Sequence, residues 1–222
     1  MWKSILYKEW LKLKWIFLLF TLAGLLAVGS IFLNVRHDIL FNGASNYWYS
    51  SLFMGFQYFQ MMKYILLPIG IAVGLAQYFP ETVNKRIKLS FHLPVDENKI
   101  LVIMMLCGTI SLIISFGLMF LLFWGLSIHF LPDEIVYAAL ISIIPWFLAG
   151  FSIYYFIGLI VLEPVWKYWI LYGLVGFAII GLYMETSVTG AFGPINPKLL
   201  MLTGLLSISL LFSANRFRKG EM

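Results

Sequence analysis

Six apolar runs divide the chain, and polar or charged segments separate them. A helix needs roughly 20 residues, and at least about 17, to cross the hydrocarbon core of a bilayer. Inside such a helix, the backbone groups find their hydrogen-bond partners without water. The pattern therefore predicts an all-α polytopic membrane protein. Its single transmembrane domain covers residues 1–222 and has six helices, at about 15–35, 52–79, 100–128, 135–162, 166–184 and 198–215.

The composition supports a lipid environment. Hydrophobic residues make up 62% of the chain and charged residues 11%, whereas a soluble domain carries about 25% charged residues. The net charge of +5 is also found in nucleic-acid-binding proteins, but here the basic residues flank apolar runs and form no separate basic face. Because Cys107 is the single cysteine, no disulfide can form within the chain.

The distribution of lysine and arginine predicts the orientation, because these residues accumulate in short cytoplasmic loops. With the N-terminus in the cytoplasm, Arg36 and Lys198 lie outside, and Lys63 lies within or near the second span. Both termini are then cytoplasmic. The remaining twelve of the fifteen basic residues are on the inner side: Lys3, Lys8, Lys12, Lys14, Lys85, Arg86, Lys88, Lys99, Lys167, Arg216, Arg218 and Lys219.

The N-terminal segment, residues 1–14, has an amphipathic pattern. Trp2, Leu6, Trp10 and Leu13 fall on one arc of about 80° at helical spacing. This predicts an interfacial helix on the inner leaflet, and the alternative is a basic flank that only fixes topology. The lysines and the apolar run are also typical of a signal peptide, but the run continues through Leu33, which favours a membrane span.

The loop between the second and third spans is the longest charged segment in the middle of the chain. Its apolar positions Val83, Ile87 and Phe91 are four residues apart, and its basic residues lie between them. Pro80 suits a helix start, and Pro94 ends any helix before it. We therefore expect an amphipathic helix at 81–93. It is either a coupling helix that docks on a cytoplasmic partner or a basic loop that only fixes topology.

Lys63 is the ionisable residue deepest in an apolar context. On a helical wheel it shares a polar face with Gln57 and Gln60. At helical rise it lies roughly 25 Å from Pro80, near the outer headgroups. It either snorkels to those headgroups or contributes to a polar outer vestibule, which is a possible translocation pathway.

The sequence lacks the residues that several kinds of chemistry require. The chain has no Gly-rich phosphate loop that ends in Lys-Ser or Lys-Thr, so ATP binding of that kind is not expected. His37, His92 and His129 are isolated and lack metal-ligand spacing. We find no candidate catalytic, cofactor-binding or metal-binding residue and expect no enzyme activity in this chain.

The order of parts resembles a known family. Lys8-Glu9-Trp10 opens a basic amphipathic segment that runs into the first span, and six spans have both ends inside. The loop after the second span has Glu81, a basic amphipathic stretch and then Leu93-Pro94-Val95-Asp96. This order resembles the permease subunits of ABC-2 type (type V fold) ABC transporters. The Gly-Thr pair usual in that loop is replaced by residues 85–88.

The resemblance implies a permease subunit of an exporter in a bacterial plasma membrane. Its partners would be a second permease copy or homologue and two copies of a cytoplasmic ATPase subunit, which hold ATP and Mg²⁺. It implies ATPase coupling by Glu81, Val83, Lys85, Arg86, Ile87, Lys88 and Phe91. It also implies that the second and fifth spans line the interface between permeases, with Gln57, Gln60 and Lys63 near the outer end of the pathway.

Two other function classes stay open. A stand-alone six-helix carrier or channel would need polar groups along the whole depth of a span. A membrane enzyme that acts on lipid would need acids, histidines or a metal set clustered near one interface. Neither the transported substrate nor the choice between a homodimer and a heterodimer can be read from the sequence.

Overall fold

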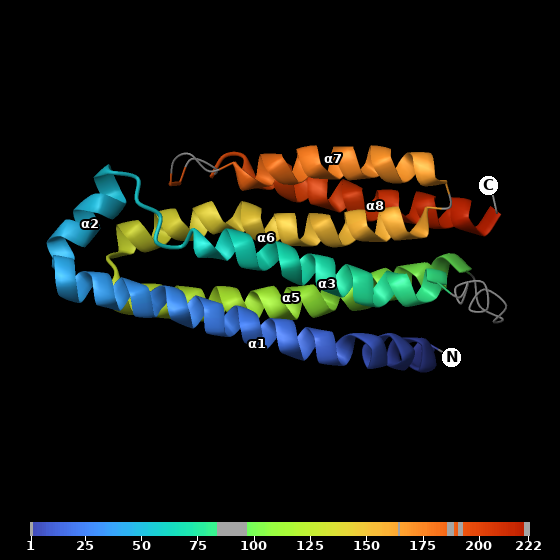
Figure 1. Ribbon diagram of the computed structural model, residues 1–222, viewed down its shortest axis with the longest axis horizontal. Helices are drawn as coiled ribbons and strands as arrows, with labels where there is room; N and C mark the ends of the chain where they lie inside the picture. Colours follow the sequence, from blue (N-terminus) through green and yellow to red (C-terminus); the bar gives the residue numbers. More distant parts are fainter. Residues whose placement is uncertain (1, 84–96, 164, 186–188, 191–192, 220–222) are drawn as a thin grey trace.

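The computed structural model describes residues 2–83, 97–163, 165–185, 189–190 and 193–219. In these residues the chain forms seven helices joined by turns and short connections (Figure 1). They are α1 (Trp2–Asn42), α2 (Ala44–Phe53), α3 (Met61–Val83), α5 (Glu97–Phe130), α6 (Asp133–Leu162), α7 (Trp166–Met184) and α8 (Asn196–Lys219). The expected all-α fold is confirmed.

The long helices lie side by side as one bundle. α3 and α6 run through its middle, α1 and α5 form one side, and α7 and α8 form the other (Figure 1). The most extensive contacts are those between α3 and α6 and between α1 and α5. The start of α1 and the end of α8 lie at one end of the bundle, and α2 lies at the opposite end.

Five of the described helices are long and apolar enough to cross a membrane, namely α1, α3, α5, α6 and α7. This agrees with a multi-pass membrane protein. The sixth predicted span, at about 198–215, falls within α8 and stays a prediction. At 1.5 Å per residue, the 41 residues of α1 extend over about 61 Å, twice the hydrocarbon thickness of about 30 Å. α1 is therefore long enough to project beyond the bilayer at both ends.

The second span is shorter than the sequence pattern predicted. The second span was predicted to begin near residue 52. In the structure α3 begins at Met61, and a separate helix, α2, occupies Ala44–Phe53. Gly43 and Gly55 flank α2 with φ angles of 78° and 69°. These are left-handed conformations that glycine adopts readily and other residues rarely do. The two glycines therefore end one helix and redirect the chain before the next.

The N-terminal segment is also different from the prediction. α1 is one helix from Trp2 onward, with no break near residue 14, so a separate interfacial helix is wrong. Leu13 is buried as part of the core, but Leu6 and Trp10 face outward. The buried face of the segment includes Ile5 and Glu9 instead. Glu9 and the neighbouring Lys12 contact Gln77 and Glu81 of α3, respectively.

The core at the α2 half of the bundle is aromatic. Phe59 lies between Phe123 and Trp146, with ring centroids 6.5 and 5.5 Å away, and Phe32 and Tyr58 pack against Phe123. Outward-facing positions are apolar as well, and Phe177 of α7 is 81% exposed within the chain. Such a surface fits lipid or a neighbouring helix rather than water.

Candidate functional site

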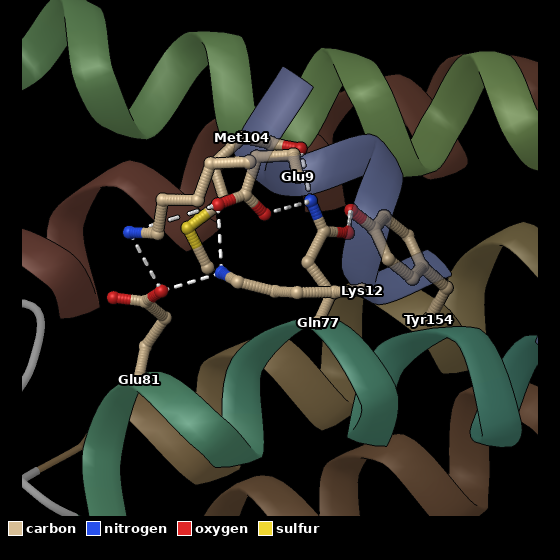
Figure 2. Close-up of polar contacts among 7 residues, drawn as sticks. Glu9, Lys12, Gln77, Glu81, Met104 and Tyr154 are labelled. Carbon is tan, nitrogen blue, oxygen red and sulfur yellow. Dashed lines mark hydrogen bonds and ion pairs between the residues drawn. The ribbon is translucent and has the colours of Figure 1, made fainter. Parts of the chain in front are cut away.

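A buried ionic cluster joins α1 to α3 (Figure 2). It belongs to the first turns of α1, which lie at the end of the bundle where the chain starts (Figure 1). Lys12 Nζ lies 2.7 Å from Glu9 Oε1 and also pairs with Glu81 Oε1. Lys8 Nζ lies 2.8 Å from Glu81 Oε1 and 4.0 Å from Glu9 Oε1. Two ammonium groups thus compensate two carboxylates, and Lys12 bridges them.

Burial makes this compensation important. The side chains of Glu9 and Glu81 are each 2% exposed, whereas that of Lys8 is 45% exposed. A carboxylate removed from solvent loses several kcal/mol of hydration, so it remains charged only beside a well-placed cation. The deep part of the cluster is therefore formed by Glu9, Lys12 and Glu81, and Lys8 connects it to the surface.

A chain of polar side chains continues from the cluster into the bundle. Gln77 Nε2 lies 3.4 Å from Glu9 Oε2 and also donates to the carbonyl oxygen of Met104 on α5. The Tyr154 hydroxyl donates to Gln77 Oε1 at 2.8 Å and lies 2.9 Å from the Tyr78 hydroxyl. The network thus connects α1, α3, α5 and α6 at one level (Figure 2).

Helical spacing brings these side chains together. Gln77 and Glu81 are four residues apart on α3 and therefore share one face. Lys8 and Lys12 share a face of α1 in the same way. On α5, Gly108 leaves the space that the network occupies. A Cβ at Gly108 would lie 2.2 Å from both Gln77 Oε1 and the Tyr154 hydroxyl oxygen.

Glu81 is the one predicted coupling residue whose side chain the structure shows in a defined site. It belongs to the last turns of α3 rather than to a separate coupling helix, because α3 continues through Pro80 to Val83. The start of a helix at Pro80 was therefore wrong. Lys85, Arg86, Ile87, Lys88 and Phe91 lie outside the described residues, so the coupling helix itself stays a prediction.

The predicted outer pathway residues are arranged differently from the helical wheel. Gln57 and Gln60 lie in the connection before α3, and Lys63 lies in its first turn. The prediction that these three residues share a helical face was therefore wrong, because residues 54–60 are not helical. Both glutamines line a cavity of about 360 Å³ near α2, and Lys63 is not among its lining residues.

Sequence reasoning did not identify Glu9, Lys12 or Gln77 as site residues. One signal was present, because Gln77 and Glu81 place two polar groups on one face at the end of an apolar helix. The other signal was Glu9, an acid within the basic N-terminal segment. Neither signal shows that the two faces meet.

The paired charges of the cluster link α1 to α3. Among the residues that the structure describes, no group of three or more His, Cys, Asp and Glu is placed to hold a metal ion. The charges of the cluster are directed at one another. Comparisons with family models, curated proteins and solved structures found no match to the chain.

Proposed function

We propose that this chain is the membrane-spanning permease subunit of an ABC exporter, which couples ATP hydrolysis by a separate ATPase subunit to substrate export. The observation that carries the proposal is the ion-paired cluster of Lys8, Glu9, Lys12 and Glu81. It lies at the end of α3, directly before the segment with the pattern of a coupling helix. That end also holds the start of α1, which the lysine distribution places in the cytoplasm.

The cluster would pass force from the coupling segment to the bundle. A partner that moves residues 84–96 acts first on the last turn of α3, where Glu81 lies. The ion pairs with Lys8 and Lys12 then carry the displacement to α1, and Gln77 and Tyr154 carry it to α6. Packed helices move as rigid bodies, so a shift at this end changes the helix arrangement over their whole length.

A second permease copy would complete the translocation path. The described side chains of α7 are mostly exposed and apolar, and α3 also exposes Tyr64 and Phe79. These surfaces are available to another copy, in line with the expected interface of the second and fifth spans. Within one chain, the polar cluster and the cavity near α2 are separated by the aromatic core around Phe59 and Trp146, which disfavours a stand-alone carrier or channel.

The test is affinity purification of the tagged chain in mild detergent, followed by mass spectrometry of the co-purified proteins and an ATPase assay. We expect a nucleotide-binding ATPase subunit at equal copy number, with ATP hydrolysis in the purified complex. The test variant is Glu81→Gln, which should reduce either the recovery of the ATPase subunit or the ATP hydrolysis of the purified complex. Recovery of the stable wild-type chain alone, without ATPase activity, would overturn the proposal in favour of a stand-alone carrier or channel.

A further inference from the structure

Two adjoining cavities are lined by residues of α1, α2 and the connection before α3. α2 lies at the end of the bundle opposite to the start of α1, which holds the ionic cluster (Figure 1). One has a volume of about 400 Å³ and is lined by Asp38, Asn42, Asn46, Tyr47, Ser50 and Phe56. The other, of about 360 Å³, shares Asp38, Tyr47 and Phe56 with the first. Cavities of this size can hold a small polar molecule or a lipid headgroup.

Tyr47 has an unused hydrogen-bonding group at this site. Its side chain is buried, the residue being 5% exposed, and its hydroxyl has no hydrogen-bond partner among the described residues. Burial, and after it the nearby carboxylate of Asp38, raises the pKa of Tyr47, so the hydroxyl is protonated at neutral pH. A buried hydroxyl is normally satisfied, and here the cavity offers the room for a partner.

Asp38 gives the cavities a negative character. It is the one charged residue among the described residues that line them. Asp38 also contacts the imidazole of His37, whose Nδ1 lies 3.5 Å from Asp38 Oδ1 on the same exposed stretch of α1. A carboxylate with no lysine or arginine in the lining favours a cationic group and repels an anion.

Aromatic rings in the lining indicate which kind of cation fits the cavities. The rings of Tyr47 and Phe56 lie edge to face with centroids 5.7 Å apart, and both contribute to the two cavities. Aromatic faces attract ammonium groups, and a carboxylate beside them strengthens that attraction. A hard metal ion would instead need several carboxylate or carbonyl ligands, and the described part of the chain has no acidic cluster of that kind.

We propose that these cavities bind an organic ammonium group, with Asp38 as its counter-ion, Tyr47 as its hydrogen-bond partner and Phe56 as its aromatic wall. Two sources share this chemistry, the amine headgroup of a lipid and a soluble amine. The inference does not depend on the proposed export function, because it concerns binding by the chain itself.

The experiment measures binding by the full chain in lipid nanodiscs through its thermal unfolding midpoint. Choline and ethanolamine are the soluble probes, titrated in phosphatidylglycerol nanodiscs. Nanodiscs that contain phosphatidylethanolamine, compared with pure phosphatidylglycerol, test the lipid source. We expect a saturable rise of the midpoint in at least one arm. A rise with soluble amines assigns a soluble ligand, and a rise confined to phosphatidylethanolamine assigns a lipid.

Variants of the lining residues test whether the ammonium group binds in these cavities. Asp38→Asn should weaken the apparent affinity at least about tenfold, since it removes the counter-ion but keeps the shape. Phe56→Leu preserves all charges and should weaken the apparent affinity about threefold. This variant tests the cavities even if Asp38→Asn does not fold. Glu134→Gln changes an exposed acid at the start of α6 and should bind as the wild type does. No response in any arm, or equal affinity in both cavity variants and the wild type, would overturn the proposal.

Discussion

Lys12 on α1 pairs with Glu81 on α3, although the two residues are 69 positions apart in the sequence. Lys12 also holds Glu9 at 2.7 Å, so one partly buried ammonium group pairs with two carboxylates. The pair therefore links α1 to α3 near the start of the chain. Several expected outcomes depend on this arrangement.

Removing the charge of Glu81 should destabilise the protein. Glu81→Gln leaves Lys8 and Lys12 with Glu9 as their one described carboxylate partner. Glu81→Gln removes the charged acceptor that both lysines share, and a hydrogen bond to a charged group contributes about 1.5–3 kcal/mol, so we expect a loss of about 2 kcal/mol. The measurement is the free energy of unfolding in detergent by denaturant titration, compared with the wild type.

Lys8 provides the matched control for that substitution. Its side chain is 45% exposed, so solvent screens its pair with Glu81, and Lys12 still pairs with both carboxylates when Lys8 is replaced. Pairs screened in this way contribute about 0–1 kcal/mol. Lys8→Met should therefore cost about 1 kcal/mol or less. A loss from Lys8→Met as large as that from Glu81→Gln would contradict the deep position of Lys12 in the cluster.

The Tyr154 hydroxyl is expected to stabilise the network beyond the ionic cluster. Tyr154→Phe removes the donor to Gln77 Oε1 and the contact with the Tyr78 hydroxyl. Because Gln77 is fully buried, its carbonyl oxygen then lacks this partner, at a cost of about 1–3 kcal/mol. The control is Tyr137→Phe, since Tyr137 is 69% exposed and should change stability by less than about 0.5 kcal/mol. Equal effects of the two substitutions on the denaturation midpoint would refute the role of Tyr154.

Gly108 should be intolerant of even a methyl group. Gly108→Ala places a Cβ 2.2 Å from Gln77 Oε1 and the Tyr154 hydroxyl, so both buried groups must shift. Overpacking of this kind costs about 1–3 kcal/mol. Gly117 lies on the same helix with no described neighbour within 4 Å of an added Cβ. Gly117→Ala should therefore be neutral or stabilise by up to about 1 kcal/mol. Thermal unfolding of both variants, side by side, checks the difference.

Charge reversal in the predicted coupling segment should uncouple ATP hydrolysis without preventing membrane insertion. Arg86→Glu combined with Lys88→Glu changes the face expected to dock on the ATPase, while Lys85, Lys99 and the N-terminal lysines still direct topology. The measurement is the ATPase activity of the purified complex in lipid nanodiscs. Arg216→Glu combined with Arg218→Glu alters the inner charge equally and should retain activity. An inserted, fully active Arg86/Lys88 variant would refute docking by that face.

The membrane spans could be predicted well where lipid imposes one simple requirement. A long apolar run must become a helix, and the bounds expected for 166–184 agree with α7 (Trp166–Met184). The start of α3 was missed because the apolar run continues through Gly55, and its φ of 69° depends on neighbours that one sequence does not reveal. Composition alone does not distinguish one helix from two joined by a turn.

The candidate site was harder to predict, because it depends on contacts between distant segments. Helical periodicity assigned Trp10 to the membrane-facing arc and left Glu9 unexplained. It cannot show that Glu9 and Lys12 meet Gln77 and Glu81, since that depends on how α1 packs on α3. Of these residues, Glu81 was identified because its position in the loop resembles a known family, not because its contacts could be derived.

α1 is one unbroken helix that reaches from the ionic cluster to the cavities near α2. Lys12, in the ionic cluster, and Asp38, in the cavities near α2, are both on this one helix, about 39 Å apart along its axis at helical rise. If α1 tilts about its middle as a rigid body, its two ends move in opposite directions. Under the proposed coupling, a pull on Glu81 that displaces one end of α1 would therefore change the cavity at the other end, and a molecule bound at Asp38 would resist that pull.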